Sequence, residues 1–302
     1  MDKKVTAVVV TYNRKTLLKE CIKSLLAQTY KNLDILVIDN ASTDGTEDFV
    51  KKIDNSRVSY VNTGENLGGA GGFQFGVKAS TKLKPDYLWL MDDDSIPTPN
   101  ALEKLMEVAE NIGEFGFLAS KVLWKDKSMC NMNVPKVTLN RKLQDFDGNP
   151  KKIIMGTFVS FFVPMKVVKE VGLPIKEFFI WADDFEYSRR ISRQYPAYFV
   201  PESVVIHKCK SNNGSNIVND SPDRFKRYEL AYRNEVYVYR REGISGWVHL
   251  GLKTILHLTK VIMKSKDNKK RRIQIIWNAT KKGFSFKPTI EYLRTDDGEI
   301  SS

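Results

Sequence analysis

The chain has 302 residues, enough to bury one large hydrophobic core or two small ones, and its 42% hydrophobic and 28% charged residues are ordinary for a folded, soluble protein. This composition excludes a collagen-like chain, an intrinsically disordered chain and a bundle of membrane-spanning helices. The net charge of +12 is concentrated in residues 208–302, where 20 Lys and Arg against 10 Asp and Glu predict an anionic partner, either a membrane surface or nucleic acid.

The first apolar run, Val5 to Val10, is too short for the core of a signal peptide, and no small-residue cleavage site follows it. We therefore expect a cytoplasmic protein that lies, at most, peripherally on the inner face of the cell membrane. The three cysteines, Cys21, Cys130 and Cys209, are odd in number and widely spaced, so we expect them to be reduced and structural.

Strand and helix patterns alternate along the first half of the chain. The predicted elements are strand Val5 to Val10, helix Lys15 to Ala27, strand Leu33 to Ile38, helix Thr43 to Ile53 with Ser42 as N-cap, strand Val58 to Val61, helix Phe73 to Ser80 and strand Tyr87 to Met91. This alternation predicts an α/β fold with a mainly parallel central sheet flanked by helices.

The second half is less regular. The predicted elements are a helix beginning near Pro97 to Ala101, strands Phe117 to Leu123 and Phe158 to Val163, a short helix after Pro164, a helix ending at Arg193, strands Tyr198 to Val200 and Ser203 to His207, and helices Pro222 to Arg241 and Ile244 to Lys264. Residues 124–150 form an excursion without a clear pattern, and the Asn- and Ser-rich residues 211–221 predict a loop. We therefore divide the chain into a domain over residues 1–210 and a helical, basic region over 211–302.

The predicted helix Ile244 to Lys264 is long enough to suggest a membrane span, but its charges exclude one. One side carries His249, Lys253, His257, Lys260 and Lys264, which project within roughly 80° of one another. The opposite side carries Trp247, Ile255, Leu258 and Ile262. The pattern predicts an amphipathic helix that either lies on a membrane surface or packs on the catalytic domain.

Three polar motifs follow predicted strands, at Thr11 to Arg14, Asp39 to Asp44 and Asp92 to Asp94. In open α/β sheets, ligands bind at the carboxyl ends of the strands, so the three motifs predict one shared site. The alternative is that each is an ordinary polar loop.

The triplet Asp92 to Asp94 directly follows the apolar run Trp89 to Met91. Three adjacent carboxylates repel one another and are tolerated at the end of a buried strand where a cation neutralises them. Oxygen ligands favour Mn²⁺ or Mg²⁺, which often binds together with a phosphate. The alternative is a solvated acidic turn that caps the following helix.

Residues 63–73 form a glycine-rich turn that leads into a helix. Such a turn lets the backbone approach a ligand closely or lets a strand and a helix pack tightly. Its spacing is neither that of a dinucleotide fingerprint nor that of a P-loop, so an ATPase or a dehydrogenase is disfavoured.

Asp183, Asp184 and Glu186 open a predicted helix, where acidic side chains either complement the helix dipole or supply a general base. His207 ends a predicted strand. A lone histidine there is either structural or the third ligand, with two aspartates, of a Mn²⁺ site.

Together these motifs resemble the family 2 glycosyltransferases of the GT-A fold, over most of residues 4–242. The motifs occur in the family's order and read Val-Val-Val-Thr-Tyr-Asn-Arg, Val-Ile-Asp-Asn-Ala-Ser-Thr-Asp-Gly-Thr, Asn-Leu-Gly-Gly-Ala-Gly-Gly-Phe, the Asp triplet and Trp-x-Asp-Asp-x-Glu. The ordered set is far more specific than any one motif.

The resemblance implies a role for each matching residue. Residues 1–210 would be the nucleotide-sugar-binding and catalytic domain. The donor nucleotide would be bound by Thr11, Tyr12, Asn13, Arg14, Asp39, Asn66, Gly69 and Asp92. The metal would be held by Asp92, Asp94 and His207. Asp184 would be the catalytic base, and Trp181, Asp183 and Glu186 would contact the acceptor or the transferred sugar. Arg233 and Asn234 match a recurring element of this branch of the family.

The implied reaction is an inverting sugar transfer, in which Asp184 takes a proton from an acceptor hydroxyl. The motifs look most like those of bacterial galactofuranosyltransferases that use UDP-galactofuranose, and rhamnosyltransferases that use dTDP-rhamnose share much of the pattern. Ala182 and the shorter chain depart from the enzymes that make long galactofuranose polymers. The implied acceptor is a growing polysaccharide on a polyprenyl carrier.

Two other classes of protein compete with this interpretation. A nucleotide-sugar-binding protein without catalytic activity would share the motifs, although Asp92, Asp94 and Asp184 are all present. A nucleic-acid-binding protein would explain the basic C-terminal region, but no nucleic-acid-binding motif occurs, so we expect no nucleic-acid partner.

Overall fold

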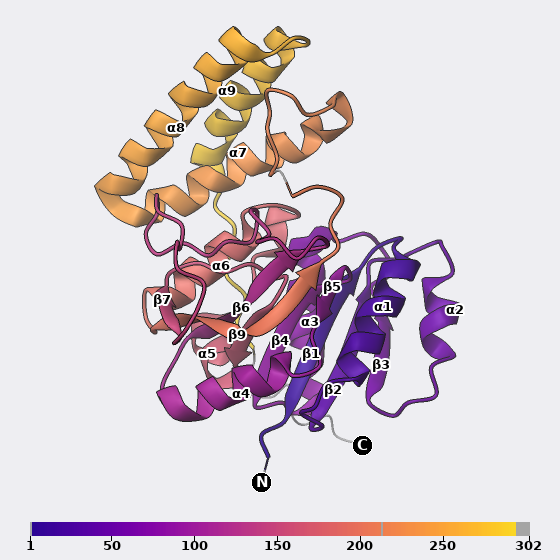
Figure 1. The fold of residues 1–302 in the computed structure, drawn as a ribbon. Coiled ribbons are helices and arrows are strands. Elements are labelled where there is room, and N and C mark those ends of the chain that lie inside the picture. Colours follow the sequence, from indigo (N-terminus) through magenta and orange to yellow (C-terminus); the bar gives the residue numbers. More distant parts are fainter. Residues whose placement is uncertain (1, 213, 294–302) are drawn as a thin grey trace.

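The computed structural model describes residues 2–212 and 214–293 (Figure 1). The first half contains β1 (Val5–Thr11), α1 (Lys15–Leu26), β2 (Leu33–Asp39), α2 (Thr46–Lys51), β3 (Val58–Asn62), α3 (Gly68–Ser80), the 3₁₀ helix η1 (Thr81–Leu83) and β4 (Tyr87–Asp92). The middle contains β5 (Ser95–Pro97), α4 (Ala101–Ile112), β6 (Phe117–Trp124), β7 (Lys151–Ile153), β8 (Phe161–Pro164), α5 (Met165–Val171), η2 (Lys176–Phe178), α6 (Asp183–Ser192) and β9 (Ala197–His207). The C-terminal part contains η3 (Pro222–Arg224), α7 (Phe225–Tyr239), η4 (Arg240–Glu242), α8 (Gly243–Lys264) and α9 (Lys269–Ser285).

The strands form one sheet in the order β3-β2-β1-β4-β8-β6-β9-β5, with β7 paired to β9. Strands β1 to β4, β6 and β9 run in one direction, and β5, β7 and β8 run against them. The predicted α/β fold with a mainly parallel sheet is therefore confirmed.

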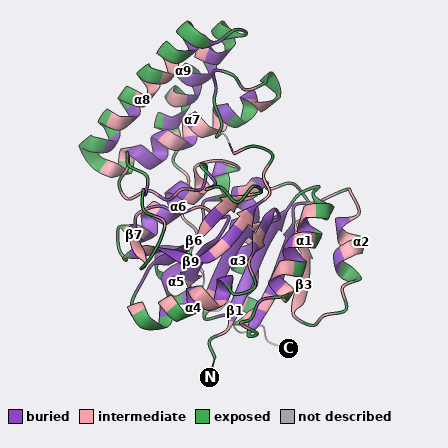
Figure 2. Cartoon of the chain, viewed as in Figure 1, coloured by how far each residue is buried: buried purple, intermediate pink, exposed green. Residues whose placement is uncertain are grey.

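Hydrophobic layers cover both faces of the sheet, which explains the continuous apolar run of β1. On one face, Val9 packs in the layer that includes α1 and α4. On the other face, Val8 and Val10 pack in the layer that includes α3, α5 and α6. Figure 2 shows the central strands in purple, whereas the edge strand β3 is only partly buried.

Glycines allow α3 to lie directly against β1. A Cβ at Gly72 would lie 2.5 Å from Val10 Cγ1, and a Cβ at Gly76 would lie 2.4 Å from Val8 Cγ1. Tight packing between strand and helix, one of the two interpretations of the glycine-rich turn, is thus part of its role. The helix begins at Gly68 instead of Phe73 because contacts from other elements, not helix propensity, stabilise its first turn.

Several element boundaries differ from the sequence prediction. α2 begins at Thr46, and Ser42 accepts a hydrogen bond from the backbone N–H of Asn13 at 2.8 Å instead of capping the helix. The two predicted strands near the end of the domain are one strand, β9, with an irregular register opposite Ser120 and Lys121. Strand β5 and helix α9 have no counterpart in the prediction. Strand β5 has only three residues, and α9 begins with four charged residues, so both give weak periodic signals.

Helices α7, α8 and α9 pack together beyond the carboxyl edge of the sheet (Figure 1). The side of α8 that carries His257 and Lys253 faces inward, where Tyr232 Oη lies 2.7 Å from His257 Nδ1 and Lys253 Nζ contacts Glu235 Oε1 at 2.6 Å. The helix thus packs on α7 and α9 of the C-terminal region, and its polar side makes the contacts with α7. No helix among residues 2–212 and 214–293 is both long and apolar enough to cross a membrane.

Candidate active site

The candidate site lies where the carboxyl ends of β1, β2 and β4 meet. β1 is central among the three, with Thr11 paired to Asp39 in β2 and Val10 paired to Asp92 in β4. Because the strands are parallel, the polar segments that follow them reach the same edge of the sheet. A cavity of about 990 Å³ opens at this edge and extends to α7 and α8.

Asp93 joins the triplet to β1 and to the segment after it. Thr11 donates a hydrogen bond from Oγ1 to Asp93 Oδ2 at 2.7 Å, and Arg14 donates one from Nη1 to Asp93 Oδ1 at 3.3 Å. The same Arg14 nitrogen lies 2.8 Å from Asp94 Oδ2. Burial raises the pKa of Asp93 to about 6, although Arg14 opposes the rise. Asp93, to which no role is assigned from the sequence, therefore positions Thr11 and Arg14.

Asp92, Asp94 and His207 form a cluster in which one potential ligand atom from each lies within 4.8 Å of the others. Pairing of Ser95 in β5 with His207 in β9 brings the histidine beside the triplet. His207 Nε2 lies 3.1 Å from Asp94 Oδ1, and Nδ1 lies 2.8 Å from Asn133 Oδ1. Asn133 uses its amide nitrogen to donate to Thr157, so its oxygen accepts the Nδ1 proton, and Nε2 faces the aspartates.

The electrostatics of this cluster favour a bound cation. Burial, together with the neighbouring Asp94 and Asp93, raises the pKa of Asp92 well above its usual value. Burial alone would raise the pKa of Asp94, but contacts with His207 and Arg14 hold it below its usual value. Asp94 Oδ1 is buried and has no partner in hydrogen-bond geometry within the described part of the chain. Two carboxylates and an imidazole suit Mn²⁺ or Mg²⁺, so these three residues fit such an ion.

Asp183 and Asp184 open α6 and line the same cavity. Burial and the adjacent Asp184 raise the pKa of Asp183 to about 7. Burial raises the pKa of Asp184 to about 6, against the hydrogen bond that Phe185 N–H donates to Asp184 Oδ1 at 2.7 Å and the charge of Lys136. A carboxylate with a pKa near 6 is largely ionised at neutral pH and can still accept a proton, which suits a general base.

The segment before Asp183 has an unusual backbone. Phe179, Trp181 and Ala182 all have positive φ angles, between 62° and 65°, which cost energy for residues other than glycine. Asn234, fully buried in α7, holds this segment. Its Nδ2 donates to the carbonyl oxygens of Phe178 at 3.0 Å, Ile180 at 3.3 Å and Trp181 at 2.9 Å.

Most of the residues predicted from the sequence meet in this cavity. Those that line it are Thr11, Tyr12, Arg14, Asn66, Gly69, Asp92, Asp94, Trp181, Asp183, Asp184 and His207. They come from five separate stretches of the chain, which the sheet edge and α6 bring together.

Three predicted residues are not among the described residues that line the cavity. Asn13 accepts a hydrogen bond from Thr43 N–H at 2.7 Å, and Asp39 accepts hydrogen bonds from Ser42 N–H at 2.8 Å and from Tyr60 Oη at 2.7 Å. Asn13 therefore joins the loop after β1 to the loop after β2, and Asp39 joins the end of β2 to the loop that follows it and to β3. Glu186 is buried and pairs with Arg190, 2.7 Å from Oε2 to Nη2, so its carboxylate is used within α6.

Several lining residues were not predicted. Asn40 lies in the motif Asp39 to Asp44, and its Nδ2 donates a hydrogen bond to the carbonyl oxygen of Gly68 at 2.9 Å. Asn131, Met132, Asn133 and Lys142 come from the excursion without a clear pattern. The wall on the C-terminal side is formed by residues of α7 and α8, namely Lys226, Arg227, Tyr228, Leu230, Ala231, Tyr232, Glu235, Lys253 and His257. Tyr228 and Tyr232 were the available signal, since their spacing of four residues places them on one side of the helix.

Residues 6–171, more than half of the chain, match the family described as Glycosyl transferase family 2. The chain belongs to this family. It is 24% identical over 262 residues to galactofuranosyltransferase GlfT1 of Mycolicibacterium smegmatis, a match that covers 80% of this chain and 84% of that relative. A shorter match, 33% identical over 90 residues, covers 30% of this chain and 35% of an Escherichia coli protein named UDP-Glc:alpha-D-GlcNAc-diphosphoundecaprenol beta-1,3-glucosyltransferase WfaP.

A solved structure supports the family's fold. The mannosyltransferase PcManGT from Pyrobaculum calidifontis, in complex with GDP-Man and Mn²⁺, is similar with a TM-score of 0.57 and 15% sequence identity. The similarity covers 92% of this chain and 74% of that chain. The resemblance to family 2 glycosyltransferases of the GT-A fold is thereby confirmed, and the chain is a glycosyltransferase.

Proposed function

We propose that this glycosyltransferase is a metal-dependent, inverting enzyme that transfers galactofuranose from UDP-galactofuranose to a hydroxyl of a lipid-linked polysaccharide. The observation that carries the proposal is the cavity shared by the cluster Asp92, Asp94 and His207 and by the carboxylate of Asp184. The cluster of Asp92, Asp94 and His207 suits a cation that binds a diphosphate. The carboxylate of Asp184 is suited to accept a proton. A carboxylate that binds a metal is a poor base, so the chemistry needs this separation.

The side chains supply distinct parts of an inverting reaction. A divalent cation held by Asp92, Asp94 and His207 would neutralise charge on the diphosphate. Arg14, which lies beside Asp94, adds a fixed positive charge near the same place. Asp184 accepts the proton of an acceptor hydroxyl as its oxygen attacks the anomeric carbon from the face opposite the leaving nucleoside diphosphate, which departs with the electrons of the broken bond.

The relatives support this choice of donor and acceptor. GlfT1 is named a galactofuranosyltransferase and matches most of this chain, which supports galactofuranose as the sugar. The name of WfaP describes an acceptor on diphosphoundecaprenol, which supports a polyprenyl-linked glycan and hence activity at a membrane surface. The cavity extends past Trp181 to Tyr228 and Tyr232, which supports an acceptor that binds beside Asp184.

The test is a panel of nucleotide sugars, including UDP-galactofuranose, UDP-galactopyranose, UDP-glucose and dTDP-rhamnose, assayed for binding and Mn²⁺-dependent turnover. We expect preferential turnover of UDP-galactofuranose. Preference for dTDP-rhamnose would make the chain a rhamnosyltransferase. Binding without hydrolysis or transfer of any donor would support a non-catalytic nucleotide-sugar-binding protein and would contradict the proposal.

His207→Ala is expected to weaken Mn²⁺ binding about ten-fold or more, because it removes a ligand and leaves the buried Asp94 without its neighbour. Isothermal titration of the protein with MnCl₂, without donor, measures this effect. His249→Ala is the matched control, since His249 packs against Tyr239 outside the cavity lining. Equal Mn²⁺ affinity in the two variants would exclude His207 as a ligand.

A further inference from the structure

Helix α8 turns an apolar face to solvent. The exposed side chains of this face are Ile244, Val248, Leu252, Ile255, Ile262 and Met263. Ile244, Val248, Ile255 and Ile262 are separated by four, seven and seven residues and so form one line along the helix. Between 55% and 84% of each of these four side chains is accessible. Figure 2 shows the exposed outer side of α8 in green.

The apolar surface continues onto α9. The rings of Trp247 in α8 and Phe284 in α9 stack with their centroids 5.7 Å apart, and both are exposed. Trp277, on the same helix as Phe284, is 62% accessible. Ten of the large hydrophobic side chains that the described chain exposes therefore lie on these two helices. Contiguous surfaces of this kind mark sites of interaction.

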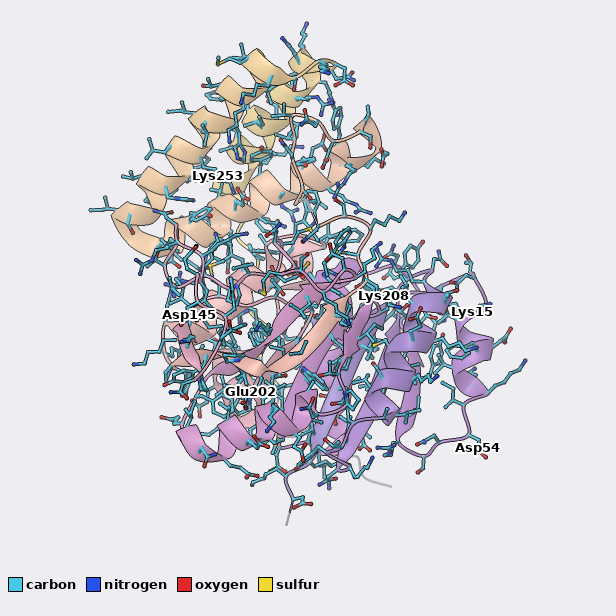
Figure 3. The ribbon with its side chains drawn as sticks, viewed as in Figure 1. Lys15, Asp54, Asp145, Glu202, Lys208 and Lys253 are labelled. Atoms are coloured by element: carbon cyan, nitrogen blue, oxygen red, sulfur yellow. The ribbon has the colours of Figure 1, made fainter. Side chains whose placement is uncertain are left out.

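The opposite side of α8 is fixed, so the apolar face cannot rotate inward. Lys253, labelled in Figure 3, forms an ion pair with Glu235 in α7, and His257 is hydrogen-bonded to Tyr232. Val261 is fully buried against the other helices. Lys253 and His257 also line the active-site cavity. One helix thus forms a wall of the cavity with one side and an exposed apolar surface with the other.

The charge around this surface indicates its partner. Residues 243–285 contain ten Lys and Arg against one acidic residue, Asp267, but Lys253 and Arg271 pair with acidic residues of α7, and Arg272 is buried. The seven lysines that remain are exposed on α8, on α9 and on the segment between them, namely Lys260, Lys264, Lys266, Lys269, Lys270, Lys281 and Lys282. Association of two copies through this face would bring two such sets of charges together and is disfavoured. A bilayer with anionic lipids instead attracts the cations, takes up the aliphatic side chains and accommodates tryptophan at the interface between water and lipid.

We propose that α8 docks in the plane of a bilayer that contains anionic phospholipid, with Ile244, Val248, Ile255 and Ile262 inserted below the headgroups. The wall of the cavity that Lys253 and His257 of α8 form then lies one helix diameter, about 10 Å, from the lipid surface. The inference rests on the proposed function only for the lipid-linked acceptor, because the docking needs no sugar transfer.

The test is co-sedimentation of the full-length protein with vesicles of phosphatidylglycerol and phosphatidylcholine, compared with phosphatidylcholine alone, at low and high salt. We expect binding to the anionic vesicles that weakens with salt. Val248→Gln/Ile255→Gln removes two inserted side chains without changing charge and should weaken binding by at least about ten-fold. Lys269→Gln/Lys270→Gln should weaken binding to the anionic vesicles and reduce its salt dependence.

Tyr292→Gln is the matched control, because Tyr292 is exposed beside Gly172 in the catalytic domain and should have no effect. Unchanged vesicle binding of Val248→Gln/Ile255→Gln would overturn the proposal. So would a wild-type dimer, seen by light scattering without lipid, that these substitutions dissociate. Binding of the nucleotide-sugar donor, measured without vesicles, should be the same in the wild type and in Val248→Gln/Ile255→Gln. If neither protein bound the donor, the result would count against the proposed function and not against membrane docking.

Discussion

Asp184→Asn is expected to lower the rate of sugar transfer by about 10² to 10⁴-fold while leaving donor binding unchanged. Asparagine has the shape of aspartate and can still accept the hydrogen bond from Phe185 N–H, but it cannot take a proton from the acceptor hydroxyl. Steady-state transfer kinetics and a binding titration with the nucleoside diphosphate measure the two quantities separately.

Asp54→Asn serves as the control, because Asp54 is exposed on the turn after α2, away from the cavity lining (Figure 3). In the wild type, kcat/KM should fall as the pH decreases through about 6, where Asp184 becomes protonated, and the fall should approach ten-fold per pH unit. The adjacent Asp183, with a pKa of about 7, and Lys136 influence this titration. A folded Asp184→Asn enzyme that transfers sugar at the wild-type rate would remove Asp184 from the role of base.

Asn234→Leu is expected to lower the free energy of unfolding by about 3 kcal/mol, because backbone carbonyls that Asn234 now satisfies would lose their donor. Those carbonyls belong to the strained segment that positions Asp183 and Asp184. Relaxation of this segment by about 1 Å is enough to lower the transfer rate roughly 10²-fold. Chemical denaturation and transfer kinetics measure the two effects.

Asn278→Leu, a change of the same chemistry at an exposed position of α9, should alter neither quantity. If Asn234→Leu lost stability but kept the wild-type rate per folded molecule, Asn234 would stabilise the fold without positioning the acidic pair. If both properties stayed at wild-type levels, the hydrogen bonds of Asn234 would not hold the segment at all.

The shared edge of the sheet could be predicted from the sequence because it depends on local patterns. Apolar runs identify parallel strands, and parallel strands end at one edge, so Thr11, Asp39 and Asp92 were expected at the same edge, where the structure places them. The contribution of Asn133 could not be predicted, because the surrounding segment has no periodicity. Its contact with His207 joins residues 74 positions apart.

The orientation of α8 shows a second limit of sequence patterns. Periodicity separates the two sides of a helix, but it does not say which side faces the protein. The inward side is decided by Glu235 and Tyr232 on α7, which pair with Lys253 and His257. The usual rule that the apolar side of a helix is buried therefore fails at α8.

The glycines of α3 set intrinsic propensity against tertiary packing. Alanine at Gly72 or Gly76 would favour the isolated helix by about 1 kcal/mol per site. In the folded chain the added methyl would collide with Val10 or Val8 and push α3 away from β1. Since the first turn of α3 contributes Gly69 to the cavity, such a shift would also move this part of the cavity wall. A substitution that raises helix propensity would thus destabilise the folded protein. The residues of β1 that face α3 therefore limit which side chains this helix can carry.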